Sequence, residues 1–273
     1  MNRIVLAAVL AAMLAVCATA VGASARNAAP PPTKEAGKLI VGFDLPAPGF
    51  WNGRATGTTI KNPTGFEAQL SREIAKTLGI STVEYLRAPF GGLFSPSPKK
   101  YDFALEEVTI GVARAKVVAF STPYFDATQG VLIRKGLSPK PTKVSDLKSL
   151  QLCAQATTTG LAYIQHKLRP AKKALVYSAS STAAFDAVEA RRCDALILDT
   201  PIVVSQSQKK KGAYGGVVGQ IVTNEFYGAV LEKGSKFKPA LNQAIGTLRA
   251  NGTIQRLQVK WLPFSRVPVW KTQ

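Results

Sequence analysis

VTIGVARAKVVAFSTPY, residues Val108–Tyr124, is the most informative stretch of this chain. It begins as a β-branched run, places Arg114 beside a turn, and predicts a second strand that ends in Ser-Thr-Pro-Tyr. A guanidinium binds a carboxylate through two parallel hydrogen bonds, and a hydroxyl such as that of Thr109 can complete the shell. We therefore predict that Arg114 binds a carboxylate, with a surface or structural ion pair as the alternative.

Strand and helix patterns alternate on both sides of this segment. Strands are expected over 38–44, 83–86, 102–110, 152–156, 174–177 and 194–199, and around 227–231. Helices are expected over 66–78, 144–147, 160–166, 181–192, 241–248 and 254–261. The alternation predicts an α/β protein with mainly parallel sheets flanked by helices, and 273 residues suit two domains of ordinary size.

Four polar side chains lie at or just past the carboxyl ends of expected strands, where α/β proteins bind ligands: Asp44, Arg114, Thr159 and Asp199. One cation and two anions facing a cleft suit a zwitterion. Arg114 would bind its carboxylate, Asp199 its ammonium group and Asp44 its side chain. Helix capping is the alternative role for Asp199, before Thr200, and for the threonines 157–159.

The N-terminus has the pattern of a secretory signal peptide. An apolar run follows Arg3, and Ala23-Ser24-Ala25 supplies small residues for cleavage. We predict a signal peptide over 1–25, a flexible linker over 26–37, and an exported, periplasmic or extracytoplasmic protein. A membrane anchor is one alternative, and a lipid anchor at Cys17 is another, although Val16 stands where that motif needs a small residue.

Loss of the signal peptide would leave Cys153 and Cys193 in an oxidising compartment. Each begins an expected strand, and the two strands are expected to be neighbours, which predicts a disulfide with two buried free thiols as the alternative. The single histidine, His166, lies in a polar helical stretch and is expected at the surface. No metal site is expected, because no second histidine or cysteine pair has ligand spacing.

The formal net charge of +19 raises the question of a nucleic-acid partner. The lysines and arginines are spread along the chain, however, and only 209–211 form a run. The export signal also argues against nucleic acid. We predict a solvated basic surface suited to an anionic envelope or an acidic partner.

Six segments together resemble the family 3 solute-binding proteins of ABC transporters, which bind polar amino acids. They are VGFD, GFEAQLSREIAKTLG, VTIGVARAKVVAFSTPY, QATTTG, CDALILDTP and NGTIQRLQVKW, in this order between about Lys38 and Trp261. The resemblance implies the two-lobe, type II periplasmic-binding-protein-like fold, in which two hinge strands join the lobes. Lobe 1 would comprise 38–125 plus 226–273 and lobe 2 would comprise 126–225, with hinges near 124–128 and 223–227.

The resemblance also implies a ligand site. Its expected residues are Asp44, Phe50, Phe90, Glu107, Thr109, Arg114, Gln155, Thr159 and Asp199. The chain departs from the family at Gly111, which lacks a hydroxyl, at Gln69, which replaces an acid, and at Glu107, where the family often has a small residue. Glu107 could turn to solvent; if it faces the pocket, a ligand with a basic or strongly donating side chain is favoured.

The function implied is capture of an amino acid between the lobes, hinge closure, and delivery to an ABC permease with its ATPase. We expect a monomer that is not an enzyme and needs no cofactor. Two alternatives remain. One is an exported dehydratase of the same fold that acts on a prephenate-like or arogenate-like acid, with Glu107 as its general acid. The other is a sensory binding protein with a receptor as its partner.

Overall fold

The computed structural model describes residues 30–177, 180–262 and 266–271. The chain divides into an N-terminal unit, Met1–Pro30, and a second unit, Pro31–Gln273, which holds both sheets. The expected signal peptide, Cys17 and the first residues of the expected linker lie outside the described residues. No helix within the described ranges is long and apolar enough to cross a membrane.

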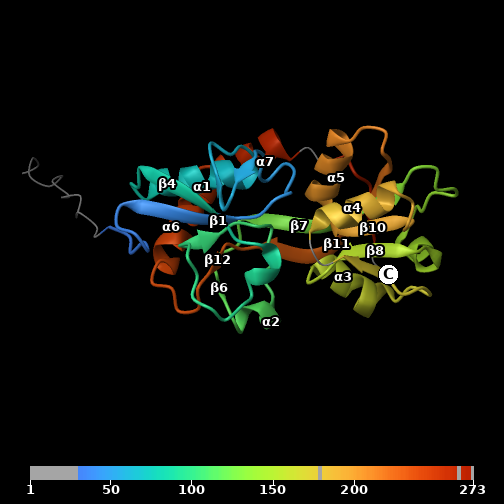
Figure 1. Cartoon of the computed structure of the whole chain (residues 1–273), viewed down its shortest axis with the longest axis horizontal. Coiled ribbons are helices and arrows are strands. Elements are labelled where there is room, and N and C mark those ends of the chain that lie inside the picture. The colour runs from blue at the N-terminus through green and yellow to red at the C-terminus, as the bar shows by residue number, and fades with distance from the viewer. Residues whose placement is uncertain (1–29, 178–179, 263–265, 272–273) are drawn as a thin grey trace, which may run out of the picture. The chain divides into compact units, whose positions relative to one another are not determined.

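The first sheet has seven strands in the order β2-β3-β4-β1-β5-β12-β6. Figure 1 labels β4, β1, β12 and β6 among them. Its parallel centre comprises β1 (Lys38–Phe43), β4 (Thr82–Arg87) and β5 (Phe103–Ala104). The outer strands are β2 (Ala55–Thr56), β3 (Thr59–Ile60), β12 (Val230–Leu231) and β6 (Ala119–Phe120), which pair antiparallel.

Three helices pack together beside this sheet: α1 (Phe66–Thr77), α6 (Lys238–Ala250) and α7 (Thr253–Trp261). Each follows the apolar spacing seen in the sequence, because the residues three and four apart lie on one buried face. In α1 these are Phe66, Leu70 and Ile74, all fully buried.

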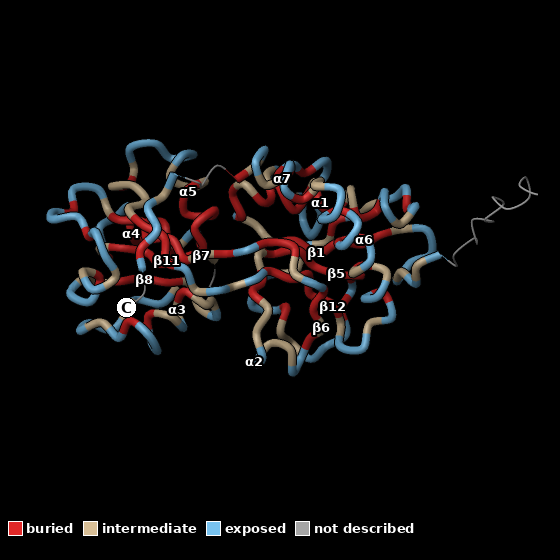
Figure 2. Tube along the Cα trace, turned by 180° about the vertical axis from the view of Figure 1, so that it is seen from behind, coloured by how far each residue is buried: buried red, intermediate tan, exposed pale blue. Residues whose placement is uncertain are grey.

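The second sheet has six strands in the order β13-β11-β7-β10-β8-β9. Its parallel strands are β10 (Ala195–Asp199), β8 (Leu152–Gln155) and β9 (Leu175–Tyr177). The long strands β7 (Phe125–Arg134) and β11 (Tyr214–Tyr227) pair antiparallel, and β13 (Val269–Trp270) lies parallel to β11. Three helices contact this sheet: α3 (Thr159–Tyr163), α4 (Ser181–Glu189) and α5 (Thr200–Lys209). Figure 2 shows β1, β5, β7 and β8 as largely buried and much of the surrounding surface as exposed.

The two-sheet α/β architecture predicted from the sequence is confirmed, whereas several boundaries differ. The strand expected over 102–110 is reduced to β5. It could not continue to 110, because Glu107 has a left-handed backbone (φ 52°) that an extended strand does not permit. The turn expected at Arg114 is a short helix, α2 (Val112–Ala115). The strand expected around 227–231 is divided between the two sheets, as the end of β11 and as β12.

The lobe boundaries stay a prediction, with one difference in detail. The sequence grouping placed 226–273 entirely in lobe 1, but β13 pairs with Gln220 and Ile221 of the second sheet. The expected hinge segments pair with each other: Phe125 with Tyr227, Asp126 with Phe226, and Ala127 with Glu225. A register shift between Ile221 and Glu225 interrupts this ladder just beyond them.

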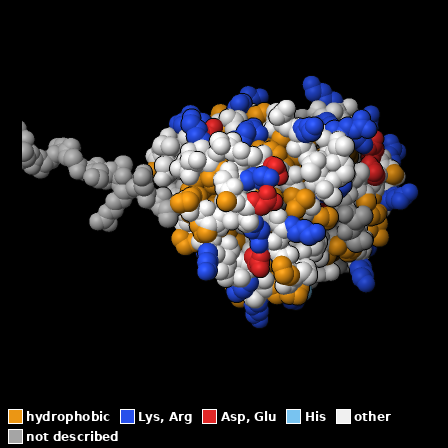
Figure 3. All heavy atoms as spheres, turned by 60° about the vertical axis from the view of Figure 1, so that its left-hand side comes forward, with side chains coloured by type: hydrophobic (Ala, Val, Ile, Leu, Met, Phe, Trp, Pro, Cys, Tyr) orange, Lys and Arg blue, Asp and Glu red, His pale blue; other side chains and the backbone are white. Residues whose placement is uncertain are grey.

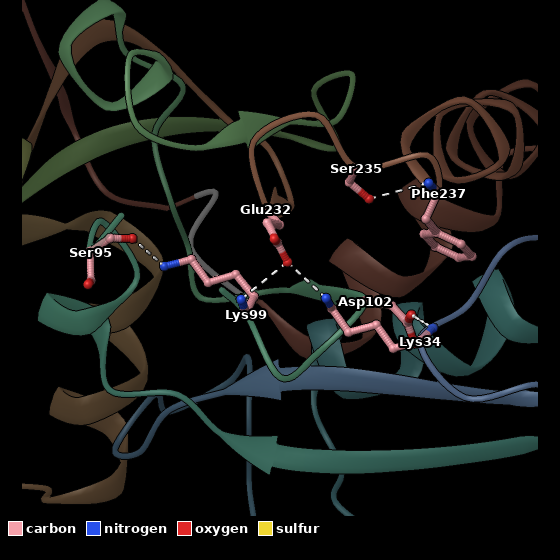
Figure 4. Close-up of polar contacts among 7 residues, drawn as sticks. All are labelled: Lys34, Ser95, Lys99, Asp102, Glu232, Ser235 and Phe237. Atoms are coloured by element: carbon pink, nitrogen blue, oxygen red, sulfur yellow. Dashed lines mark hydrogen bonds and ion pairs between the residues drawn. The ribbon is translucent and has the colours of Figure 1, made fainter. Parts of the chain in front are cut away.

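The described part of the expected linker over 26–37 makes contacts with the first sheet. The backbone N–H of Lys34 donates to Asp102 (2.6 Å) and its ammonium group pairs with Glu232 (2.8 Å), as Figure 4 shows. The other oxygen of Asp102 accepts from the N–H of Ile40 at the start of β1 (2.7 Å). Figure 4 also shows Glu232 accepting from the backbone of Lys99. These contacts fasten residue 34 to the first sheet.

The predicted disulfide between Cys153 and Cys193 is present, with its Cα atoms 5.9 Å apart. Cys153 lies in β8 and Cys193 just before β10, and these strands are neighbours in the second sheet. His166 is exposed in a π-helical turn over Ile164–Leu168.

Candidate functional site

A pocket lies where loops of the first sheet meet α3, α4 and the end of β10. The empty space at this place is about 590 Å³ when the open solvent at its mouth is included. Eight of the nine predicted site residues line it: Asp44, Phe90, Glu107, Thr109, Arg114, Gln155, Thr159 and Asp199. The pocket thus brings together residues that lie far apart in the sequence.

Phe50 is the exception. It is fully buried and is not among the described residues that line the pocket. Its ring packs edge-on against Phe66 and Phe125, each with centroids 5.8 Å away, and lies 6.1 Å from Tyr227. The expectation of a pocket wall is therefore corrected: Phe50 belongs to an aromatic cluster in the core beneath the hinge segments.

Arg114 is positioned by α2 and by two carbonyl groups. One guanidinium nitrogen donates to the carbonyl of Thr109 (2.8 Å), and the other donates to that of Thr157 (2.9 Å), which precedes α3 of the second sheet. The guanidinium also lies over the rings of Phe94 (4.8 Å) and Phe90 (5.6 Å). These contacts fix the cation at the pocket wall and supply cation–π stabilisation.

The cap of α3 is Thr158, whose hydroxyl accepts from the N–H of Leu161 (3.2 Å). Thr159 is therefore not needed as a cap, and its hydroxyl instead donates to Glu225 (2.5 Å). Gly160 permits this approach of α3 to β10, since a Cβ atom there would lie 2.7 Å from the carbonyl oxygen of Ile197. The capping role expected as an alternative is therefore seen for Thr158, whereas Thr159 lines the pocket.

Asp199 occupies the N-cap position of α5 but makes no side-chain cap bond within the described chain. Its carboxylate accepts from the amide of Gln129 (2.5 Å). Burial raises the pKa of Asp199 to about 7, and the nearby charge of Glu225 adds to this rise. Asp199 is thus a buried acid at the pocket, and a cation beside it would favour its ionised form.

Asp44 is already paired. It accepts from the guanidinium of Arg87 (3.1 Å) and from the backbone N–H groups of Leu45 (2.8 Å) and Phe90 (3.2 Å). Its charge is therefore balanced by the protein itself, which leaves it less able to bind a ligand cation than the sequence suggested.

Glu106 and Glu107 are the acids that lack such balance. Both carboxyl oxygens of Glu106 and one carboxyl oxygen of Glu107 are buried. None of these three atoms has a hydrogen-bond partner among the described residues. Both side chains line the pocket, so the solvent-facing alternative for Glu107 is not what the structure shows. Burial raises the pKa of each glutamate well above its usual range. The negative charge of Glu67 adds to the rise for both, and the charge of Asp44 adds to it for Glu106.

Sequence reasoning missed Glu106 and the polar residues beneath the pocket. Glu67, in α1, accepts from the N–H of Glu107 (3.0 Å), the indole of Trp51 (2.8 Å) and the hydroxyl of Tyr124. Gln129, a polar residue within the apolar run of β7, and Glu225, in the hinge strand β11, form a second group. The signal that could have found Glu106 is two consecutive acids directly after a buried strand.

Within the described residues, no group of three or more histidine, cysteine or acidic side chains is arranged to hold a metal ion. The lining residues instead offer one guanidinium, three threonine and two serine hydroxyls, and four carboxyl groups. Such a set can bind a small molecule that carries both a carboxylate and one or more cationic groups.

The chain is similar to several known proteins. The L-cystine-binding protein TcyJ of Escherichia coli K12 is 28% identical over 229 residues, which cover 84% of each chain. The structure of an ancestral arginine-binding protein bound to arginine is 28% identical, has a TM-score of 0.71, and matches 82% of this chain and 98% of its own. The ancestral amino acid-binding protein AncCDT-1, a precursor of cyclohexadienyl dehydratase, is also 28% identical, with a TM-score of 0.69 and coverage of 83% and 95%.

The family model of bacterial extracellular solute-binding proteins, family 3, matches residues 39–264. That range contains every residue that lines the pocket. It also contains both sheets, apart from the first residue of β1 and the terminal strand β13. This chain therefore belongs to the bacterial extracellular solute-binding proteins of family 3.

Proposed function

We propose that this protein captures a cationic amino acid, such as L-arginine or L-lysine, and delivers it to an ABC permease. The relatives named for cystine and arginine support an amino-acid ligand of an importer. The observation that carries the choice of a cationic side chain is the pair Glu106 and Glu107, which line the pocket. Both buried carboxyl oxygens of Glu106 and one of Glu107 have no hydrogen-bond partner in the described chain.

Buried carboxyl groups are costly unless a cation or donors pair with them. A guanidinium or ammonium group at Glu106 and Glu107 would supply those donors and stabilise the ionised carboxylates. The ligand's α-carboxylate would contact Arg114, and its α-ammonium group would contact Asp199. Thr109, Thr159, Phe90 and Gln155 complete the proposed contacts. In this arrangement Asp44 positions Phe90 and Arg87 rather than the ligand.

The hinge segments would allow the lobes to close on the ligand. The paired residues Phe125 with Tyr227 and Asp126 with Phe226, at the ends of β7 and β11, would form the hinge. The register shift between Ile221 and Glu225 supplies a place where the ladder can bend. The closed form would then be the one that the permease recognises. Export through a cleaved signal peptide over 1–25 and a monomeric state remain part of this proposal.

The first experiment is a thermal-shift screen followed by calorimetry on the purified protein. L-Arginine and L-lysine should raise Tm more than L-glutamine, L-glutamate and L-cystine, because their side chains carry the cation that would pair with Glu106 and Glu107. A ligand at 100 times its Kd stabilises the folded state by about 2.7 kcal/mol, which sets the size of the expected effect. Glu106→Gln/Glu107→Gln should reduce the preference for arginine over glutamine. Tighter binding of cystine or glutamine than of either cationic amino acid would contradict the choice of ligand.

Arg114→Lys tests the carboxylate contact in the same assay. Lysine keeps the positive charge but loses the bidentate geometry and the stacking on Phe94, so we expect a loss of roughly tenfold or more in affinity. Arg54→Lys is the matched control, since Arg54 is exposed and is not among the pocket-lining residues of the described chain.

A dehydratase is the second candidate, and one feature of the pocket favours it. Burial raises the pKa of the Glu106 carboxyl well above its usual range, so it can hold a proton that a leaving hydroxyl would need. AncCDT-1, named as a precursor of such an enzyme, is similar in fold. Turnover of prephenate or arogenate by the purified protein, abolished in Glu106→Gln, would favour this function over binding.

A further inference from the structure

Glu225 lies beside the groups that the proposed site uses to hold a carboxylate. The hydroxyl of Thr109 donates to one oxygen of Glu225 (2.7 Å), and the hydroxyl of Thr159 donates to the same oxygen (2.5 Å). The positive charge of Arg114 also interacts with the negative charge of Glu225. A carboxylate of the protein itself therefore has the surroundings expected for the carboxylate of the ligand.

The elements that meet at Glu225 come from different parts of the fold. Thr109 follows β5 of the first sheet, whereas Thr159 begins α3 against the second sheet. Glu225 belongs to β11 and pairs with Ala127 in the expected hinge. Its carboxylate thus connects the two sides of the pocket through the strand that joins them.

Hydrogen-bond capacity makes these contacts exclusive. A threonine hydroxyl has one O–H and can donate to one acceptor at a time. While both hydroxyls donate to Glu225, neither can donate to a ligand. The remaining neighbour, the amide of Gln129, lies 3.3 and 3.5 Å from the two oxygens of Glu225 and already donates to Asp199 (2.5 Å).

We propose that Glu225 is an internal competitor for the ligand's α-carboxylate and thereby sets the affinity and the selectivity of the site. A ligand with a carboxylate must take the two hydroxyls from Glu225 before it is fully held. A ligand without a carboxylate leaves those hydrogen bonds in place. This inference rests on the proposed binding of a cationic amino acid.

The test compares L-arginine with agmatine, its decarboxylated amine, by calorimetry on wild type and two variants. Glu225→Ala removes the competing acceptor, and Glu225→Gln keeps its shape without its charge. The preference for arginine over agmatine, expressed as the ratio of the two Kd values, should rise roughly tenfold in Glu225→Ala, because hydrogen bonds to a charged group are exchanged. Glu225→Gln should give a smaller rise in the same direction. Using the ratio cancels any effect that the substitution has on both ligands alike.

Glu73→Gln is the matched control, since it removes one carboxylate from α1 at a position that is not among the described pocket-lining residues, and it should leave the ratio unchanged. An unchanged or lower ratio in both Glu225 variants overturns the inference, even if wild type binds arginine. If neither wild type nor Glu225→Ala binds arginine, the choice of a cationic ligand fails, and the inference that rests on it fails with it. Arginine binding that appears only in Glu225→Ala supports both the choice of ligand and the competitor role.

Discussion

Asp199 shows how one residue can make binding respond to pH. In the folded protein burial holds its pKa at about 7, compared with an ordinary value of 3.8. The folded state therefore binds this proton more tightly than the unfolded state does. The stability that ligand-free protein owes to this group is present below about pH 3.8 and decreases as pH rises towards about 7.

Ligand binding has the opposite dependence. A ligand ammonium group needs the ionised form of Asp199, so the ionisation of Asp199 should increase affinity for L-arginine as pH rises to about 7 and add no further increase above it. One coupled proton gives at most about a tenfold change per pH unit. Glu106 and Glu107, whose pKa values are also raised, act in the same direction. Calorimetry from about pH 5.5 to about pH 8.5 in buffers of different ionisation enthalpy measures both the affinity and the protons released.

Asp199→Asn should weaken binding and make this pH profile shallower, because only the glutamates would remain to titrate. Asp186→Asn, a change at an exposed position of α4, should leave the profile as it is in wild type. Affinity that is constant or that falls between about pH 5.5 and about pH 7 would exclude a role for the ionised Asp199 carboxylate in binding.

At the scale of elements, the sequence predicted what is periodic and missed what depends on partners. The apolar spacing of Phe66, Leu70 and Ile74 placed α1 correctly, because a buried helical face must repeat in this way. The short helix α2 has too few residues to show a period, so Arg114 was expected in a turn.

The same limit applies to the site. Phe50 follows β1 and Phe90 follows β4, and in the sequence the two aromatic residues look alike. Only the packed fold shows that Phe50 lies in the core and that Phe90 lines the pocket. That Asp44 is paired and Glu106 is not depends on Arg87 and on the Phe90 backbone, which come from distant positions. Charge can be read from a sequence, whereas the balance of charge requires the neighbours in space.

The disulfide is the element-scale feature with the clearest effect on stability. Cys153 and Cys193 are separated by 40 residues, a loop that contains α3, β9 and α4. Closing a loop of that length lowers the entropy of the unfolded chain and should stabilise the folded protein by about 4 kcal/mol. Urea unfolding of the protein with and without reductant measures this difference. Cys153→Ser/Cys193→Ser should unfold at the same urea concentration in both conditions, and overlapping curves for wild type would contradict the stabilising role.

At the scale of the whole molecule, positive charge at the surface contrasts with acidic groups in the pocket. The chain has 35 lysines and arginines against 16 aspartates and glutamates, and four of those acids, Asp44, Glu106, Glu107 and Asp199, line the pocket. Figure 3 shows lysine and arginine side chains scattered over the visible face, with only a few acidic side chains among them. The surface is therefore more basic than it would be if the pocket acids were exposed.

This distribution predicts that the protein binds anionic membranes in a salt-dependent way. Each lysine or arginine near an anionic bilayer contributes about 1 kcal/mol, and the attraction falls off within a Debye length, which is about 30 Å at 0.01 M salt and about 3 Å at 1 M. Phosphatidylglycerol vesicles should sediment the protein at the lower salt concentration and release it at the higher one, whereas phosphatidylcholine vesicles should sediment it at neither. L-Arginine should not change the bound fraction, because its site is the acidic pocket and not the basic surface. Release by arginine at low salt would show that the vesicles and the ligand share a site, and equal sedimentation by both lipids would exclude an electrostatic cause.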